Sequence, residues 1–280
     1  MRLYCVIGHP ISHSMSPIMH NAAFKKKGLN FRYETADVTS EQLEGFMKTA
    51  RYSYAGMNIT IPHKVAVMGF LDELSREAEL IGAVNTVKCG EKMVGYNTDG
   101  VGCVKALEDA GIDVKGKRIL VVGAGGAGRA ISFQLSLEGA TVTLSDRVME
   151  KACELSQEIR SKLSCEVETV GSDAASLGDA LKDSDVFINS TPVGMKPNVS
   201  ASVIEAALLP NDIAVMDLVY NPLETRLLEI ARERGCKTVD GVGMLVHQGA
   251  QALRIWLEMD PPVKLMRDVV ISELSKSQTQ

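Results

Sequence analysis

The stretch at residues 117–130, KRILVVGAGGAGRA, constrains the fold of this chain more than any other segment. It opens with a short, nearly all-apolar run, which is typical of a strand buried on both faces of a parallel sheet. Gly123, Gly125 and Gly128 then follow in the spacing G-x-G-x-x-G, and a helical pattern begins within the glycines. A strand, a tight glycine turn and a helix in this order predict a βαβ unit in an α/β fold.

The same alternation of strand and helix patterns runs through the whole chain. In the first part, strands are expected at 2–8, 31–38 and 54–60, and a hairpin around Gly90 is expected to join 83–88 to 93–98. A second series starts near residue 99 and adds strand patterns at ATVTLSD, SDVFINS, NDIAVMDLV and CKTVD. Two helical patterns close the chain. The alternation predicts parallel sheets in two α/β domains, with a boundary near 98–101 where a strand runs into a helix.

Composition excludes several classes of protein. The 280 residues carry 30 basic and 35 acidic side chains, well mixed, for a net charge of −5. This balance favours neither a nucleic-acid partner nor a membrane-surface partner. The six cysteines are scattered without a C-x-x-C pair, and no apolar run approaches the roughly 18 residues of a membrane span. With no signal-peptide pattern at the N-terminus, the expectation is a cytoplasmic protein without disulfides.

The glycine turn predicts a dinucleotide site. The first glycine allows the tight turn, the second lets the backbone approach a pyrophosphate, and the helix N-terminus offers N–H groups to the phosphates. Asp146 and Arg147 end the next strand pattern, where a residue would read the ribose. Asp146 favours NAD, whereas Arg147 and Lys151 favour the extra phosphate of NADP. S-adenosylmethionine is an alternative ligand for such a turn.

Polar residues gather in the first half of the chain where a core would exclude them. Ser14 and Ser16 precede a helix and would share a face of an extended segment, so they either cap that helix or bind a ligand. Asn85 lies inside an apolar strand, and Asp99 either caps a helix or serves a site. Lys64 follows the strand pattern GMNIT and is either a solvated charge or a reactive group. No histidine spacing fits a zinc site, so no metal is expected.

Eight motifs, spread in order over essentially the whole chain, resemble shikimate dehydrogenase. They are GHPISHSMSPIMHNAAF, GMNITIPHK, IGAVNTV, GYNTDGVG, VVGAGGAGRA, NSTPVGM, DLVYNPLET and DGVGMLVHQGA. The first, second, fourth and last are highly specific, whereas the glycine turn is generic. The resemblance implies a substrate-binding and catalytic domain at 1–98 plus 242–280 and a Rossmann-type domain at 99–241. It also implies that the C-terminal helices pack back on the N-terminal domain.

The resemblance implies reversible, NADPH-dependent reduction of 3-dehydroshikimate to shikimate, in chorismate and aromatic amino-acid biosynthesis. The implied catalytic pair is Lys64 and Asp99. Substrate would be bound by Ser14, Ser16, Thr60, Asn85, Asp99, Tyr220 and Gln248. The cofactor would be bound by Gly123, Ala124, Gly125, Gly126, Ala127, Asp146, Arg147, Lys151, Leu218 and Gly241.

One departure from the family pattern bears on the cofactor. Many members have Asn-Arg-Thr at the ribose position, where this chain has Asp146-Arg147-Val148. NADP is the expected cofactor, and an NAD-using quinate/shikimate dehydrogenase is the alternative. A non-catalytic sensor of shikimate or of a dinucleotide is a second alternative, which the presence of both Lys64 and Asp99 disfavours. The sequence leaves the oligomeric state open, with a homodimer as one option.

Overall fold

The structure, a computed structural model, describes residues 1–278. The chain forms two compact units. Unit 1 comprises Met1–Asp99 and Val246–Glu273, and unit 2 comprises Gly100–Leu245 and, within the described chain, residues 274–278. Helix α9 (Gly241–Leu257) begins in unit 2 and continues into unit 1. No helix in the described part of the chain is both long enough and apolar enough to cross a membrane.

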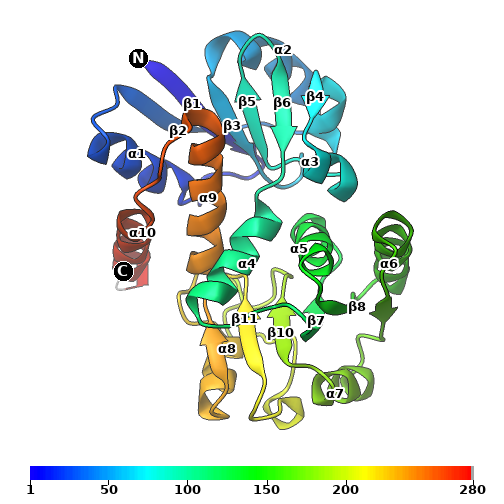
Figure 1. The fold of residues 1–280 in the computed structure, drawn as a ribbon. Coiled ribbons are helices and arrows are strands. Elements are labelled where there is room, and N and C mark those ends of the chain that lie inside the picture. Colours follow the sequence, from blue (N-terminus) through cyan, green and yellow to red (C-terminus); the bar gives the residue numbers. More distant parts are fainter. Residues whose placement is uncertain (279–280) are drawn as a thin grey trace. The chain divides into compact units, whose positions relative to one another are not determined.

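Unit 1 is built on a six-stranded mixed sheet (Figure 1). In spatial order its strands are β2 (Phe31–Asp37), β1 (Arg2–Gly8), β3 (Gly56–Ile59), β5 (Thr86–Cys89), β6 (Met93–Tyr96) and β4 (Glu73–Leu74). Strands β1, β2 and β3 are parallel, whereas β5 is antiparallel to both β3 and β6. The expected hairpin therefore makes the sheet mixed, since a tight turn can join only antiparallel strands. Its helical elements are α1 (Ser16–Lys26), α2 (Leu43–Ser53), η1 (Ala66–Phe70) and α3 (Arg76–Ile81).

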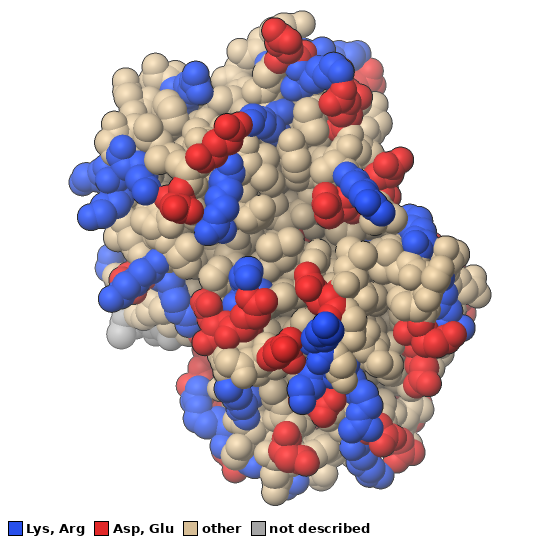
Figure 2. Space-filling model, viewed as in Figure 1, with Lys and Arg blue, Asp and Glu red and all other residues tan. Residues whose placement is uncertain are grey.

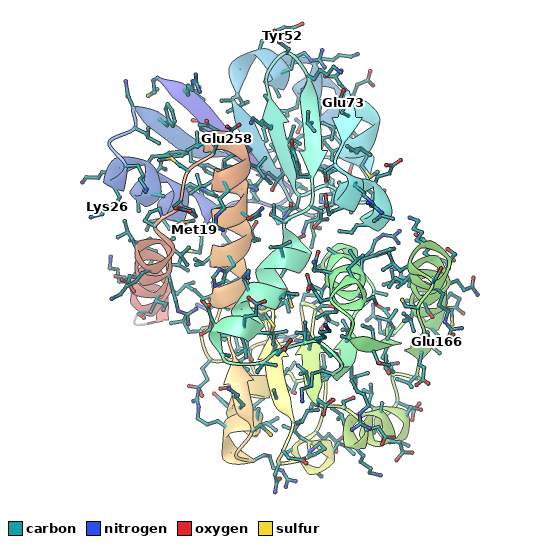
Figure 3. All side chains as sticks on the ribbon, viewed as in Figure 1. Met19, Lys26, Tyr52, Glu73, Glu166 and Glu258 are labelled. Atoms are coloured by element: carbon teal, nitrogen blue, oxygen red, sulfur yellow. The ribbon has the colours of Figure 1, made fainter. Side chains whose placement is uncertain are left out.

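The C-terminal helices pack back on unit 1, as predicted. The Trp256 indole near the end of α9 donates a hydrogen bond to the carbonyl oxygen of Val87, 2.9 Å away. The same ring covers Gly56, where an added Cβ would lie 2.4 Å from the indole nitrogen. Gly249 of α9 lies against Met19 of α1, which is labelled in Figure 3. Helix α10 (Val263–Gln278) follows. Small residues on α9 and β3 thus permit close contact between the helix and its neighbours.

Unit 2 is a doubly wound parallel sheet, as predicted. Its spatial order is β12 (Lys237–Val239), β11 (Ala214–Asp217), β10 (Val186–Asn189), β7 (Arg118–Val122), β8 (Thr141–Ser145) and β9 (Val167–Thr169). All neighbouring pairs are parallel. Its helices are α4 (Asp99–Asp109), α5 (Gly126–Leu137), α6 (Met149–Leu163), α7 (Ala174–Lys182), η2 (Ala206–Leu208) and α8 (Arg226–Glu233), with α4 starting at the last residue of the first segment of unit 1.

The strand order locates the expected ligand site of unit 2. The chain starts at the central strand β7, builds outward to β9, and then returns to the other side of β7 with β10. Open parallel sheets bind ligands at the carboxyl ends of the strands where the order reverses. That point lies between the ends of β7 and β10, and the glycine turn leaves β7 there. Strands β10 and β11 are buried along their whole length, which explains their nearly all-apolar sequences.

Charges of both signs are interspersed over the face of the molecule shown in Figure 2. Most ion pairs among the described residues involve exposed side chains, such as Lys48 with Glu44 and Lys182 with Asp179. Exposed pairs of this kind contribute little to stability. The pair between Lys64 and Asp99 differs, because both side chains are largely buried.

Candidate functional site

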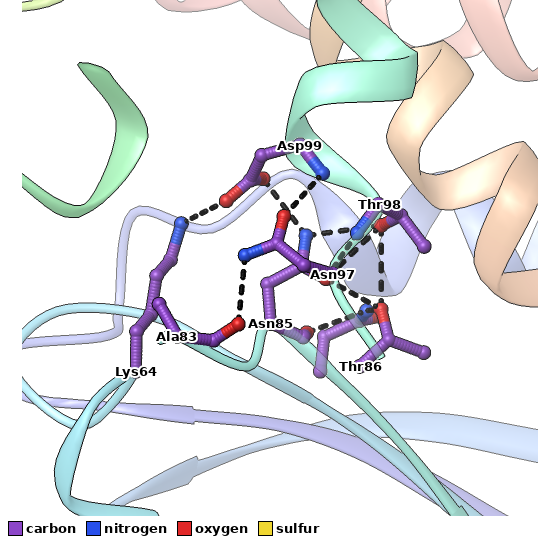
Figure 4. A network of polar contacts seen from close by, with 8 residues as sticks. Lys64, Ala83, Asn85, Thr86, Asn97, Thr98 and Asp99 are labelled. Atoms are coloured by element: carbon purple, nitrogen blue, oxygen red, sulfur yellow. Dashed lines mark hydrogen bonds and ion pairs between the residues drawn. The ribbon is translucent and has the colours of Figure 1, made fainter. Parts of the chain in front are cut away.

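Lys64 and Asp99, which are distant in sequence, meet in unit 1. Lys64 lies in the loop between β3 and η1, and Asp99 is the first residue of α4. The Lys64 ammonium Nζ lies 2.5 Å from Asp99 Oδ2 (Figure 4). Only 14% of the lysine side chain and 7% of the aspartate side chain are exposed. Burying two charges is costly unless they are paired and further hydrogen-bonded, so this pair needs support from its surroundings.

Asn85 supplies that support. Its side-chain Nδ2 donates to Asp99 Oδ1, at 2.8 Å, and to the hydroxyl of Thr98, at 2.9 Å. The backbone N–H of Thr98 donates to Asn85 Oδ1, at 2.8 Å. Because a backbone N–H can only donate, it fixes which end of the amide is the oxygen. The amide nitrogen must therefore face the carboxylate of Asp99.

Asp99 does not act as a helix cap here. Asp99 is the first residue of α4, and its backbone N–H donates a hydrogen bond to the side-chain oxygen of Asn97, 3.1 Å away. The Asn97 amide in turn donates to the carbonyl oxygen of Ala83, at 3.0 Å. Both carboxylate oxygens of Asp99 are engaged by Lys64 and Asn85. The helix start is thus organised by Asn97, which leaves the aspartate side chain to the buried pair.

Ser14, Ser16 and Thr60 lie near the carboxyl ends of β1 and β3. Ser16 is the first residue of α1, and its backbone N–H donates to the hydroxyl oxygen of Ser14, 3.3 Å away. The N-cap position belongs to Met15, which makes no side-chain capping bond within the described chain. The Thr60 N–H donates to the carbonyl oxygen of Ile7, at 2.9 Å, which extends the β1–β3 pairing. The side chains of Ser14 and Thr60 are half-buried.

The two remaining predicted substrate residues lie on different units. Gln248 is half-buried on α9 in unit 1, next to Gly249, whose backbone packs against α1. Tyr220 belongs to unit 2 and follows β11. Burial raises the pKa of its phenol, so the hydroxyl keeps its proton well above neutral pH. A protonated phenol is a hydrogen-bond donor.

The glycine turn has the geometry that a dinucleotide needs. Gly123 has φ +109°, a conformation that other residues rarely adopt. An added Cβ at Gly128 would lie 1.8 Å from the carbonyl oxygen of Gly123, so α5 approaches the turn closely. At Gly125, an added Cβ would have no described atom within 4 Å, so this side of the turn is open. The turn, including Ala124, leads directly into α5 through Gly126 and Ala127, and the first N–H groups of a helix have no intrahelical partner.

Asp146 is tied to the glycine turn. Its Oδ2 accepts a hydrogen bond from the N–H of Ala124, at 2.7 Å, and its Oδ1 accepts one from the N–H of Val148, at 2.8 Å. The carboxylate therefore braces the turn in addition to any contact with a ribose. Arg147 and Lys151 are exposed at the end of β8 and in the first turn of α6.

Leu218 and Gly241 come together beside the end of β11. An added Cβ on Gly241 would lie 2.4 Å from the carbonyl oxygen of Leu218, so the start of α9 touches this segment. Beneath them, Asp217 accepts hydrogen bonds from Thr225 Oγ1 at 2.6 Å, Asn189 Nδ2 at 2.9 Å and the Val219 N–H at 3.0 Å. Burial nevertheless raises the pKa of Asp217 to about 6.

Sequence reasoning did not identify Asp217, or Thr86 and Tyr33, as members of these polar clusters. The available signal was a polar residue inside an otherwise apolar strand, which is costly unless it is hydrogen-bonded.

Of the histidines, His20 and His63 are fully buried. His20 has no hydrogen-bond partner among the described residues, and burial lowers its pKa to about 3. No group of three or more potential metal ligands occurs within the described part of the chain.

Three family models match successive parts of the chain. The shikimate dehydrogenase substrate-binding domain matches residues 6–87, and the shikimate/quinate 5-dehydrogenase model matches 105–220. The shikimate 5′-dehydrogenase C-terminal domain matches 241–271. The first segment includes the loop that carries Lys64, the second includes the glycine turn, and the third includes helix α9.

Whole-length relatives agree with these matches. A shikimate dehydrogenase (NADP(+)) from Methanopyrus kandleri is 46% identical over 274 residues, which cover 96% of this chain and 94% of that protein. A crystal structure of a shikimate dehydrogenase in complex with NADP⁺ superimposes with a TM-score of 0.93 at 44% identity, covering 98% of this chain and 96% of the other. A shikimate 5-dehydrogenase from Listeria monocytogenes, in complex with shikimate and NAD, gives a TM-score of 0.91 at 38% identity, covering 96% of each chain. The chain therefore belongs to the shikimate dehydrogenase family.

Proposed function

We propose that this protein is an NADP-dependent shikimate dehydrogenase that reversibly reduces 3-dehydroshikimate to shikimate. The observation that carries the proposal is the buried contact between Lys64 Nζ and Asp99 Oδ2 within the polar cluster of unit 1. The names of the relatives support the same activity. This reaction belongs to chorismate and aromatic amino-acid biosynthesis.

Lys64 and Asp99 act as the proton-transfer pair in this proposal. A bound nicotinamide cofactor would supply or take up the hydride. When a ketone carbon accepts hydride, negative charge develops on its oxygen. The Lys64 ammonium would stabilise that charge and donate a proton, and Asp99, 2.5 Å from it, would orient the ammonium. In the reverse direction, the same groups accept the hydroxyl proton.

Neutral hydrogen-bonding side chains suit a small polyhydroxy carboxylate. Ser14, Ser16, Thr60 and Asn85 supply hydroxyl and amide groups that can bond either the carboxylate or the ring hydroxyls. Asp99, Tyr220 and Gln248 complete the proposed substrate set. We assign the substrate-binding domain to residues 1–98 with 242–280, of which 279–280 lie outside the described residues. Nucleotide binding is assigned to residues 99–241, which also contribute Asp99 and Tyr220 to the substrate set.

The glycine turn would hold the pyrophosphate at the start of α5. Gly123, Gly125 and the segment from Gly126 provide close backbone approach, and Leu218 and Gly241 would flank the nicotinamide. Arg147 and Lys151 would bind the 2′-phosphate of NADP. Asp146 supports the alternative, an NAD-using quinate/shikimate dehydrogenase, because a carboxylate repels that phosphate.

Initial rates measured at 340 nm with shikimate or quinate, each with NADP or NAD, test the proposal. The expected result is turnover of shikimate with NADP above the other three combinations. Preferred turnover of quinate with NAD would support the alternative. Binding without turnover in any combination would favour a sensor and contradict the proposal.

Lys64→Ala tests the assigned chemistry. Turnover should fall by roughly 10²–10⁴-fold, the usual contribution of general acid–base catalysis, while shikimate affinity changes far less. Lys48→Ala, which removes an exposed lysine paired with Glu44 in α2, is the matched control and should keep normal rates. Turnover of Lys64→Ala at the wild-type rate would remove Lys64 from the mechanism.

Two further proposals concern the cellular context. We place the protein in the cytoplasm, where its scattered free cysteines would stay reduced. A homodimer is the assembly to test first, because closed twofold dimers are the commonest oligomers. Light scattering coupled to size-exclusion chromatography distinguishes the mass of a 30.2 kDa monomer from twice that value.

A further inference from the structure

Buried polar side chains continue from Asn85 into the sheet of unit 1, away from Lys64. Thr86 of β5 and Asn58 of β3 are direct partners in the antiparallel register of these strands. Tyr33 of β2 lies beyond Asn58. All three are almost completely buried. Their neighbours on β3, Met57 and Ile59, are apolar, so polar side chains here cost free energy unless each is hydrogen-bonded.

The orientation of the Asn58 amide follows from its contacts. Its Nδ2 lies 3.2 Å from the carbonyl oxygen of Asn85 and 3.0 Å from Thr86 Oγ1. A carbonyl oxygen can only accept, so the nitrogen must be on this side. Asn58 Oδ1 therefore faces the Tyr33 hydroxyl, which donates to it at 2.7 Å. A phenol at this position is required as a donor.

Thr86 links Asn58 to Asn85 by accepting a hydrogen bond from the first and donating one to the second. Its hydroxyl oxygen accepts from Asn58 and its proton is directed to Asn85 Oδ1, 3.0 Å away. Asn85 Oδ1 thus accepts hydrogen bonds from the Thr86 hydroxyl, the Thr98 N–H and the Thr98 hydroxyl, which lies 3.1 Å away. With its oxygen held on this side, Asn85 directs Nδ2 to Asp99 (Figure 4). At each step from Tyr33 to Asn85 one donor thus points toward the carboxylate, while Asn58 Nδ2 also bonds the Asn85 carbonyl and Asn85 Nδ2 also bonds the Thr98 hydroxyl.

We propose that Tyr33, Asn58 and Thr86 are positioning residues that hold the Asn85 amide in the one orientation that supports Asp99 and, through it, Lys64. Together with Asn85 they form a donor chain from β2 to the catalytic pair. An amide turned the other way would place Oδ1 against a buried carboxylate, which repels it. This proposal rests on the proposed function of Lys64 and Asp99. It adds three residues outside the proposed substrate and cofactor sets, of which Tyr33 also hydrogen-bonds the Ser16 side chain.

The main test compares two variants of Thr86. Thr86→Val keeps the shape but removes the hydroxyl, whereas Thr86→Ser keeps the hydroxyl and removes the methyl group. A buried amide oxygen that loses one donor should loosen Asn85, so Thr86→Val should lower kcat for shikimate by about tenfold. The KM for NADP should stay close to wild type in both variants, and Thr86→Ser should keep most of the wild-type kcat. Equal kcat values for the two variants would overturn the proposal.

Tyr33→Phe tests the far end of the donor chain. It also replaces Thr86→Val as the test variant if that protein folds poorly. It should lower kcat, because Asn58 Oδ1 loses its donor. Tyr54→Phe is the matched control: its hydroxyl donates to Glu34 Oε1, 3.0 Å away, in the same unit but outside the donor chain. If Tyr33→Phe and Tyr54→Phe have the same kcat, Tyr33 has no positioning role.

An unfolding cycle separates this proposal from the proposed function. The free energies of unfolding of Thr86→Val, Asp99→Asn and the double variant should be non-additive, because the Asn85 amide is hydrogen-bonded to both Thr86 and Asp99. Additive values would overturn the donor chain whatever the enzyme does. If the wild-type protein fails to oxidise shikimate, the proposed function fails, while the cycle still decides whether the chain couples to Asp99.

Discussion

Raising the pH from 4 to 7 should destabilise unit 2 through a single buried carboxylate. Asp217 ends β11 and has no exposed surface. Burial raises its pKa from 3.8 to about 6, although hydrogen bonds from Thr225, Val219 and Asn189 act in the opposite direction. The desolvation of the carboxylate therefore outweighs three donors.

The sign of the effect follows from proton uptake. In the unfolded chain Asp217 loses its proton near pH 3.8, whereas in the folded chain it keeps the proton up to about 6. Between these values the folded state binds more protons, so stability falls as the pH rises. The penalty is complete above the folded pKa. The difference between a pKa of 3.8 and one of about 6 corresponds to about 3 kcal/mol at neutral pH.

Urea unfolding of wild type and Asp217→Asn between pH 4 and 7 measures this penalty. The variant keeps the shape and cannot ionise, so its stability relative to wild type should rise by about 2–3 kcal/mol over this range. Circular dichroism follows both units, whereas fluorescence of the single tryptophan, Trp256, follows unit 1. The control variant is Asp212→Asn, which replaces an exposed aspartate of unit 2. A stability difference that stays constant with pH would refute the reasoning.

Three other substitutions test the cofactor site and the packing of α9. Asp146→Asn should raise the ratio of kcat/KM for NADP over NAD several-fold, since the charge that repels a 2′-phosphate is gone; an unchanged ratio would mean that the carboxylate only braces the turn. Gly128→Ala should weaken NADP binding measured by calorimetry, because the new Cβ would meet the Gly123 carbonyl at 1.8 Å, and wild-type affinity would contradict that contact. Trp256→Phe should lower the free energy of unfolding of unit 1 by about 1–3 kcal/mol, because the buried Val87 carbonyl loses the indole N–H as a hydrogen-bond donor. Urea unfolding followed by circular dichroism measures this loss, and an unchanged free energy of unfolding would contradict the prediction.

Local patterns predicted most of the strands and helices of this protein. The apolar run before Gly123 and the glycine spacing predicted β7, the tight turn and α5, since all three depend on residues close in sequence. The pattern CKTVD predicted β12, which has three residues, but the similarly short strands β4 and β9 were not predicted, because their segments show no strand pattern of their own. They form strands only through pairing with β6 and β8.

The candidate site divides in the same way. The sequence by itself determined the glycine turn and the residue types available for chemistry, including the resemblance that paired Lys64 with Asp99. Only the tertiary structure decided that the Asn85 amide faces Asp99, that Asp146 braces Ala124, and that Asp217 is buried enough for its pKa to rise. Amide orientation and desolvation depend on atoms contributed by strands far apart in the chain, so no local pattern can encode them.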